Sequence, residues 1–284
     1  MEIPFFSAGF TCYVVATSLY LGYAFTKHKA LAKLGRWILI NGVILHAISL
    51  IARTIVARQI PQHGWYVPWS NWFESFSFFA MVIAIEYLII QSREHLPILG
   101  AFVTPLITSM MLVAVYSPFG TQIPSLPPAL QSYWMAIHVP VMFISYAAFG
   151  NAFAVGLVYL IQERQIKSKK PSHVAFRLPP LDELDSLIYK IIVTAWPILT
   201  LGILLGARWA YDAWGRYWGW DAKETWAFIT WVVYTIYVHL RLFIGWRGRK
   251  TAYLSLVGFC VVLFTYIGVN YLSELHGFLS GAGR

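Results

Sequence analysis

Residues 187–209 read LIYKIIVTAWPILTLGILLGARW, and this run decides the class of fold. It matches the roughly 20 predominantly apolar residues that an α-helix needs to cross a lipid bilayer. Backbone N–H and C=O groups find no water in lipid, so they bond within the segment, as in an α-helix. The sequence therefore predicts a membrane-spanning helix here, which Pro197 kinks rather than ends.

The chain contains seven further apolar runs, five before this one and two after it. They are 7–26, 37–57, 72–91, 96–117, 131–161, 225–244 and 251–272. Only 12% of the 284 residues are charged, and soluble domains carry about 25%. The expected fold is all-α: a polytopic integral membrane protein with about eight transmembrane helices, forming one domain over residues 1–284.

Cations in the connections between the runs set the expected orientation. They concentrate in the odd-numbered connections, at Lys27, Lys29, Lys33, Arg36, Arg93, Arg164, Lys167, Lys169, Lys170, Arg177, Arg241, Arg247, Arg249 and Lys250. Loops rich in Lys and Arg stay inside, so these connections should face the cytoplasm or its equivalent. An even helix count then places both termini on the extracytoplasmic side. We expect a bacterial plasma membrane, with a thylakoid membrane as the alternative.

Charge, cysteine content and the N-terminal run exclude several classes of protein. The net charge of +9 would suggest a nucleic-acid partner for a soluble domain, but here the cations orient membrane helices, so none is expected. Cys12 and Cys260 lie in apolar runs without a CxxC or CxxCH motif, which argues against a disulfide framework, a zinc site and covalent haem. Because Glu2 is acidic and no basic leader follows, the first run is expected to be a retained helix.

Tryptophans gather on the face predicted to be external. One group precedes the run 72–91, and a denser group occupies an external loop at 208–226; the members are Trp65, Trp69, Trp72, Trp209, Trp214, Trp218, Trp220 and Trp226. An interfacial aromatic belt would have similar density on both faces, yet only Trp37 and Trp246 mark the other boundary. The asymmetry favours a specific surface for a flat aromatic ligand.

Acidic residues follow both tryptophan groups. Asp221 and Glu224 fit the N-cap and third helical position of a capping box, and Asn71 and Glu74 repeat the spacing. These residues either only start their helices or also belong to a ligand site, and the two roles are compatible.

The histidines differ in their predicted depth. His138 and His276 fall on the same face as the tryptophan loop, whereas His46 and His239 lie within spans. Ionisable residues in spans usually face a cavity, although a neutral histidine bonded between helices is a fair alternative. His63 lies in an outer loop and is ambiguous. His28, His95 and His173 fall among charges and should be solvated.

Two imidazoles beside flat indoles favour haem as the ligand. Neutral imidazole is a common axial ligand of haem iron, and indoles can cover the porphyrin face. Guanidinium groups match the geometry of propionate carboxylates. The nearby candidates, each of which could instead pair with an acid of the protein or snorkel, are Arg53, Arg58, Arg208 and Arg216.

The run from Trp214 to Trp226, continuing through Trp231 to His239, resembles the WWD signature of a haem-handling family. Its members include CcmC, CcmF and CcsA (also called ResC). His138 and His276 match the two external histidines that flank this signature, and His239 matches a transmembrane histidine. The number of runs makes the chain similar to CcsA over nearly its whole length.

The resemblance implies a function. CcsA and the membrane subunit CcsB (ResB) form the System II cytochrome c synthase, a haem lyase-type complex that moves haem b to the external site. There the haem vinyl groups add to the thiols of a CxxCH motif in apocytochrome c. A thioredoxin-like thiol reductant and membrane lipid join the expected partners.

The resemblance also assigns roles to residues. His138 and His276 would be axial ligands at the external site, and His239 one iron ligand of a transmembrane site whose second ligand comes from CcsB. No acid–base catalyst is evident. The further haem-binding candidates are Trp214, Trp218, Trp220, Asp221, Trp226, Arg216 and His46.

Two other functions remain open. A haem or small-molecule exporter would use helices broken at Pro105, Pro140 and Pro197, and the purified protein would be colourless. A b-type electron-transfer subunit would hold a haem that quinol reduces, without any need for apocytochrome.

Overall fold

The computed structural model describes residues 2–60, 66–117, 121–123, 130–168 and 178–269. Within these residues the chain forms eight α-helices and no strand. The helices are α1 (Glu2–Thr26), α2 (Lys29–Arg58), α3 (Trp72–Glu94), α4 (Gly100–Val115), α5 (Trp134–Lys167), α6 (Leu181–Trp214), α7 (Ala222–Leu242) and α8 (Arg249–Leu263). A short 3-10 turn, η1 (Pro97–Leu99), precedes α4, and a π-helical turn, η4 (Phe264–Gly268), continues α8. The predicted all-α fold is confirmed.

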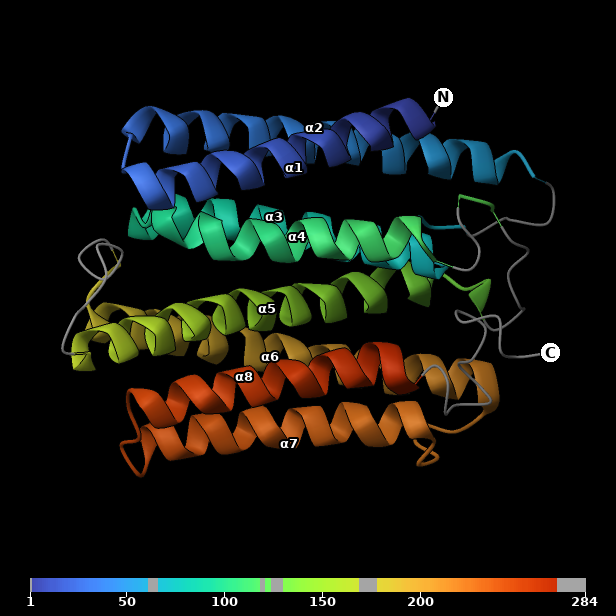
Figure 1. Ribbon diagram of the computed structural model, residues 1–284. Coiled ribbons are helices and arrows are strands. Elements are labelled where there is room, and N and C mark those ends of the chain that lie inside the picture. Colours follow the sequence, from blue (N-terminus) through green and yellow to red (C-terminus); the bar gives the residue numbers. More distant parts are fainter. Residues whose placement is uncertain (1, 61–65, 118–120, 124–129, 169–177, 270–284) are drawn as a thin grey trace.

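The helices lie side by side along one direction in Figure 1. The pair α1–α2 forms one edge of the bundle, α3–α4 and α5–α6 lie in the middle, and α7–α8 form the opposite edge. Seven of the described helical segments are long and apolar enough to cross a membrane. The exception is α7, which carries Lys223 and Glu224 in its first turn and His239 in its last. The chain is therefore an integral membrane protein.

The connections separate into two ends. Residues 27–28, 95–99 and 243–248 lie at one end of the bundle, which we term the basic end because Lys27, Arg247 and their neighbours belong to it. Residues 66–71 and 215–221 lie at the other, which we term the aromatic end (Figure 1). The helices alternate in direction as the sequence predicted. The side of the membrane that each end faces stays a prediction.

Three prolines lie inside helices and do not end them. Pro105 is in α4, Pro140 in α5 and Pro197 in α6. In lipid, neighbouring helices and side chains can satisfy the carbonyl groups that a proline leaves free.

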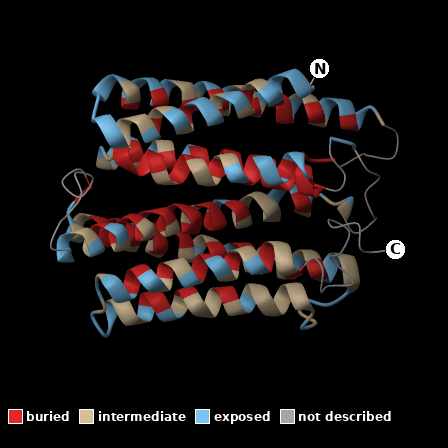
Figure 2. Ribbon diagram, viewed as in Figure 1, coloured by how far each residue is buried: buried red, intermediate tan, exposed pale blue. Residues whose placement is uncertain are grey.

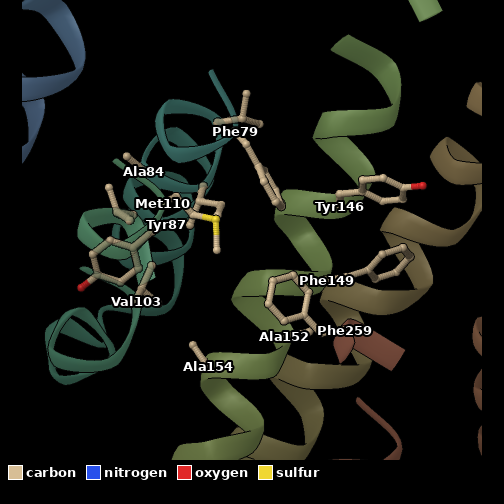
Figure 3. Packing of buried hydrophobic residues seen from close by; sticks show 14 of the residues in the cluster. Phe79, Ala84, Tyr87, Val103, Met110, Tyr146, Phe149, Ala152, Ala154 and Phe259 are labelled. Carbon is tan, nitrogen blue, oxygen red and sulfur yellow. The ribbon is translucent and has the colours of Figure 1, made fainter. Parts of the chain in front are cut away.

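The core lies where α3, α4 and α5 meet, and these helices are the most buried in Figure 2. Figure 3 shows Phe79 pointing from α3 toward α5. Its ring centroid is 5.3 Å from that of Phe143 and 5.8 Å from that of Tyr266. Phe149 stacks on Tyr234 of α7 at 3.5 Å. Aromatic contacts of this kind hold the edge pair α7–α8 to the centre of the bundle.

A buried charge cluster joins α2 to α3 near the aromatic end. The Arg53 side chain is 2% exposed, and its Nε and Nη1 atoms donate to Glu74 (2.5 Å) and Glu2 (2.6 Å). It also donates to the carbonyl oxygens of Thr121 and Gln122. Arg53 thus has acidic partners in the protein, which is one of the two alternatives that the sequence left open, and its donors are not directed at a ligand.

Glu74 also fixes the loop before α3. Its carboxylate accepts from the hydroxyl of Tyr66 and from the backbone N–H of Ser70 (2.8 Å). Burial and this carboxylate raise the pKa of Tyr66, so the phenol keeps its proton and donates. Asn71 caps α3 by accepting from the N–H of Glu74, as predicted. The loop that carries Trp69 is therefore held by buried polar contacts.

Candidate functional site

His138 lies near the start of α5 and faces α6. Its Nδ1 atom is 2.9 Å from the carbonyl oxygen of Gly202. A carbonyl oxygen only accepts hydrogen bonds, so Nδ1 carries the proton and donates it. In the neutral ring the lone pair is then on Nε2. Metal-ligating histidines are commonly held in this way, with one nitrogen fixed by the backbone and the other free to ligate.

Two glycines of α6 form the surface against which His138 packs. A Cβ atom added at Gly206 would lie 2.7 Å from Cε1 of His138, and one added at Gly202 would lie 2.5 Å from Sδ of Met142. Small residues at this four-residue spacing let membrane helices approach closely. The sequence signal for this contact is the G-x-x-x-G motif formed by Gly202 and Gly206 in an apolar run, which the sequence-based predictions did not include.

These two glycines provide a matched test of the position of His138. We expect Gly206→Ala to displace the rigid imidazole and lower the free energy of unfolding by about 1–3 kcal/mol, the usual cost of overpacking. Gly202→Ala should be tolerated because the flexible end of Met142 can move. Thermal unfolding of the detergent-solubilised protein measures both, and equal midpoints for the two variants would contradict the role of Gly206.

The loop after α6 has a fixed backbone. The C-cap residue Gly215, directly after α6, is in the left-handed conformation, and Trp220 also has a positive φ of 58°. Asp221 and Glu224 form the predicted capping box, so this prediction is confirmed. The carboxylate of Glu224 accepts from the backbone N–H of Gly219 (2.6 Å) as well as from that of Asp221 (3.3 Å). The same capping box therefore both holds the loop and begins α7.

Removal of the cap should loosen this loop. We expect Asp221→Ala to lower the free energy of unfolding by about 0.5–2 kcal/mol, the usual range for a lost N-cap. Asp221→Asn retains a cap acceptor and should lose less. Thermal unfolding of the detergent-solubilised protein compares the two, and indistinguishable midpoints for the variants and the parent would argue against the cap's contribution.

The rings of the loop differ in exposure. Trp220 is 66% exposed. Its ring meets that of Trp218 edge to face at 5.6 Å, and Tyr217 stacks on Tyr211 at 4.5 Å. The Nε1–H of Trp218 is buried and has no hydrogen-bond partner among the described residues. A buried donor of this kind is ready to bind an acceptor on a ligand.

A cavity of about 200 Å³ lies between α5, α6 and this loop at the aromatic end. His138, Trp214, Trp218 and Glu224 line it, and Lys223 is the only cation among the described lining residues. Trp69, from the first tryptophan group, and Lys223, within the capping box, also line it, and so do two residues that the sequence did not single out, Met142 and Tyr146. Packing of α5 against the neighbouring helices brings Met142 and Tyr146 to the cavity, and no local sequence signal marks them.

Other predicted site residues are not among those that line this cavity. Trp226 packs on Phe264 of η4, with ring centroids 4.3 Å apart. Arg208 pairs with Asp212, which also accepts from Trp134 Nε1 (2.7 Å). Arg216 is exposed and contacts the carbonyl oxygen of Gly219 at 3.5 Å.

The two histidines within spans are far apart in the bundle. His239 is exposed on α7 near the basic end, beside the ring of Phe243. His46 is fully buried on α2, where its nitrogens bond to Tyr13 (3.1 Å) and Ser77 (2.5 Å). The helices α2 and α7 lie at opposite edges (Figure 1), so His46 and His239 do not form one site. His276, the other predicted external ligand, lies outside the described residues, as does His63.

The chain is similar to proteins of cytochrome c maturation. A family model described as Cytochrome C assembly protein matches residues 69–276. The cytochrome c biogenesis protein CcsA of Guillardia theta is 34% identical, over 94% of this chain and 93% of that protein. CcsA of Prochlorococcus marinus subsp. pastoris is 36% identical, over 85% and 81%. CcsA of Chlamydomonas reinhardtii is 42% identical over 75% of this chain but only 61% of that protein.

A solved structure shares the fold. Cytochrome c Heme Lyase CcmF matches all of this chain with a TM-score of 0.67 and 18% sequence identity. This chain spans half of the length of that protein. At this identity the similarity shows a common helical fold.

Proposed function

Because this chain belongs to the cytochrome c assembly protein family, and within it resembles the CcsA cytochrome c biogenesis proteins, we propose that it presents haem for attachment to apocytochrome c. Haem b is the substrate rather than a resident cofactor. It supplies an iron that imidazole can ligate and vinyl groups to which thiols add. Each thiol of a CxxCH motif gives its S–H across one vinyl C=C bond, so a C–S bond forms and no oxidant is needed.

One observation carries this proposal, the hydrogen bond from His138 to the Gly202 carbonyl. It leaves Nε2 of His138 as an available ligand at a cavity walled by Trp214 and Trp218. A metal-binding nitrogen beside flat rings and the unpartnered N–H of Trp218 suits a planar metal complex with polar edges. Lys223 is positioned to attract the carboxylates of such a ligand.

The chain's own residues act mainly by positioning. His138 is fixed by α6, and the capped loop fixes the indoles, so a bound porphyrin would have one orientation toward an incoming peptide. Holding reactants in one geometry is a large source of rate enhancement. His276 is proposed as the ligand opposite His138, to be displaced by the histidine of the substrate motif.

The remaining proposals concern partners and orientation. His239 faces outward from the bundle, which supports a second transmembrane site completed by a ligand from another subunit, CcsB. The positive charge at the basic end supports an extracytoplasmic position for the aromatic end and for both termini. A bacterial plasma membrane or a thylakoid membrane meets this requirement.

The proposed function can be tested with the chain purified together with its CcsB partner. We expect a Soret absorption band and, on addition of a CxxCH apocytochrome peptide, haem that stays on the peptide after denaturation. A peptide with SxxSH in place of CxxCH is the matched control and should retain none. A colourless complex that yields no product would favour the exporter instead.

A further inference from the structure

Two aromatic side chains, a threonine and a histidine form a stripe along α7 between the two ends of the molecule. Phe228, Trp231, Thr235 and His239 are spaced by three and four residues, so they share one helix face. The stripe covers about 16 Å of the helix axis at 1.5 Å per residue. It begins below the capped loop and ends at the exposed imidazole of His239.

The rings of this stripe follow one another in contact. Trp220 of the loop meets Phe228 edge to face at 6.0 Å, and Phe228 stacks with Trp231 at 6.1 Å and 16°. Trp231 in turn stacks with Trp196 of α6 at 6.1 Å and 28°. A series of aromatic surfaces therefore connects the loop with the middle of α6 and α7.

The two central indoles are fixed by reciprocal bonds between the helices. Trp196 Nε1 donates to Thr235 Oγ1 and Trp231 Nε1 donates to Thr200 Oγ1, both at 2.9 Å. Each threonine hydroxyl gives its own proton to a carbonyl of its helix, so its oxygen is free to accept. The indole N–H groups, costly to bury unpaired in lipid, are satisfied, and the ring planes are held.

This seam between α6 and α7 lies on the surface of the bundle. Phe228 is 41% exposed, and Leu201 and Leu204 of α6 are 50% and 63% exposed. Trp196 and Trp231 are half-buried near the middle of their helices. Tryptophan at membrane interfaces forms a belt at helix ends, so two fixed indoles at mid-helix depth are not explained by a belt.

We propose that the α6–α7 seam is the path along which haem moves between His239 and the cavity of His138, on the outer surface of the bundle. This inference rests on the proposed function. A planar porphyrin matches the succession of flat rings from Trp220 to Trp231 and Trp196, and Thr235 and the exposed imidazole of His239 continue the same face of α7 beyond them. The path requires no pore through the core, which aromatic side chains fill.

The test uses the whole complex with its partner in proteoliposomes of defined orientation, with haem added on one side at a time. Trp196→Leu/Trp231→Leu removes the flat rings, whereas Trp196→Phe/Trp231→Phe keeps rings and removes both N–H donors. Trp246→Leu at the basic end is the control. Two quantities are measured: haem absorbance that depends on His138, obtained by comparison with His138→Ala in each background, and haem attached to a CxxCH peptide.

With haem added at the basic end, we expect the leucine pair to lower both quantities by about tenfold, since two aromatic contacts are lost. With haem added at the aromatic end, both should equal those of the parent, which also shows that the variant is folded. The phenylalanine pair and Trp246→Leu should match the parent from either side.

Three results would overturn the path. Full transfer by the leucine pair from the basic end would show that the seam is not used. An equal loss from both sides would show that these tryptophans only support the outer site. If the partner subunit no longer co-purified with the leucine pair, the seam would be identified as a contact for a partner helix. If the parent takes up haem from neither side, the proposed function itself fails.

Discussion

His138→Ala is expected to abolish haem binding at the aromatic end and to lower the yield of holocytochrome c by about a hundredfold or more. The substitution removes both the Nε2 atom that we propose as the iron ligand and the Nδ1–H bond to Gly202. Loss of a single metal ligand or its support commonly costs about 10–100-fold in metal affinity, and attachment further requires one fixed orientation. Haem absorbance and peptide-linked haem measure the two effects.

A matched control separates this effect from damage to α5. Ile137 precedes His138 and is 44% exposed, so Ile137→Ala should bind haem as the parent does. His138→Gly leaves space for free imidazole, which should restore haem absorbance in a concentration-dependent way. Normal yield and haem content in His138→Ala would remove His138 from the site.

Arg53→Met is expected to lower the free energy of unfolding by about 3–5 kcal/mol, the range for breaking a buried ion pair by removal of one partner. The carboxylates of Glu74 and Glu2 would lose their nearest cation, and the carbonyl groups of residues 121 and 122 would lose a donor. Unfolding in mixed micelles of increasing SDS content measures the loss.

The controls for Arg53 lie on the same helix. Arg58→Met removes an exposed cation and should leave the free energy of unfolding unchanged within about 0.5 kcal/mol. Arg53→Lys retains the charge but not the planar fork, so an intermediate loss is expected. An unchanged midpoint for Arg53→Met would show that the cluster does not stabilise the fold. Because Glu74 also holds the loop of Trp69, we expect weaker haem binding as well.

Local features of the sequence were sufficient to predict the helices and the loop between α6 and α7. The length and apolar character of the runs predicted the helices, because a backbone in lipid has few other ways to satisfy its hydrogen bonds. The capping box of Asp221 and Glu224 followed from a three-residue spacing, since both bonds form within one turn. The alternation of cation-rich and cation-poor connections also predicted which connections lie together at each end of the bundle.

Contacts between helices determined which of the histidines in the spans is buried and which is exposed. His46 and His239 are both histidines in predicted spans, yet His46 bonds to Tyr13 and Ser77 inside the bundle, whereas His239 faces outward. Which face of a helix is covered depends on its neighbours, which one sequence does not specify. In the same way, Arg53 proved to be paired with Glu74 and Glu2 rather than directed at a ligand.

The sequence by itself thus determined a bundle of membrane helices with a capped tryptophan loop at one end, because hydrophobic length and capping are local properties. Only the tertiary structure determined that the imidazole of His138 rests on Gly206, donates to the Gly202 carbonyl and keeps Nε2 free at the cavity of Trp218. That arrangement depends on the close approach of α5 and α6, since a hydrogen bond between residues 64 positions apart exists only once the two helices have packed.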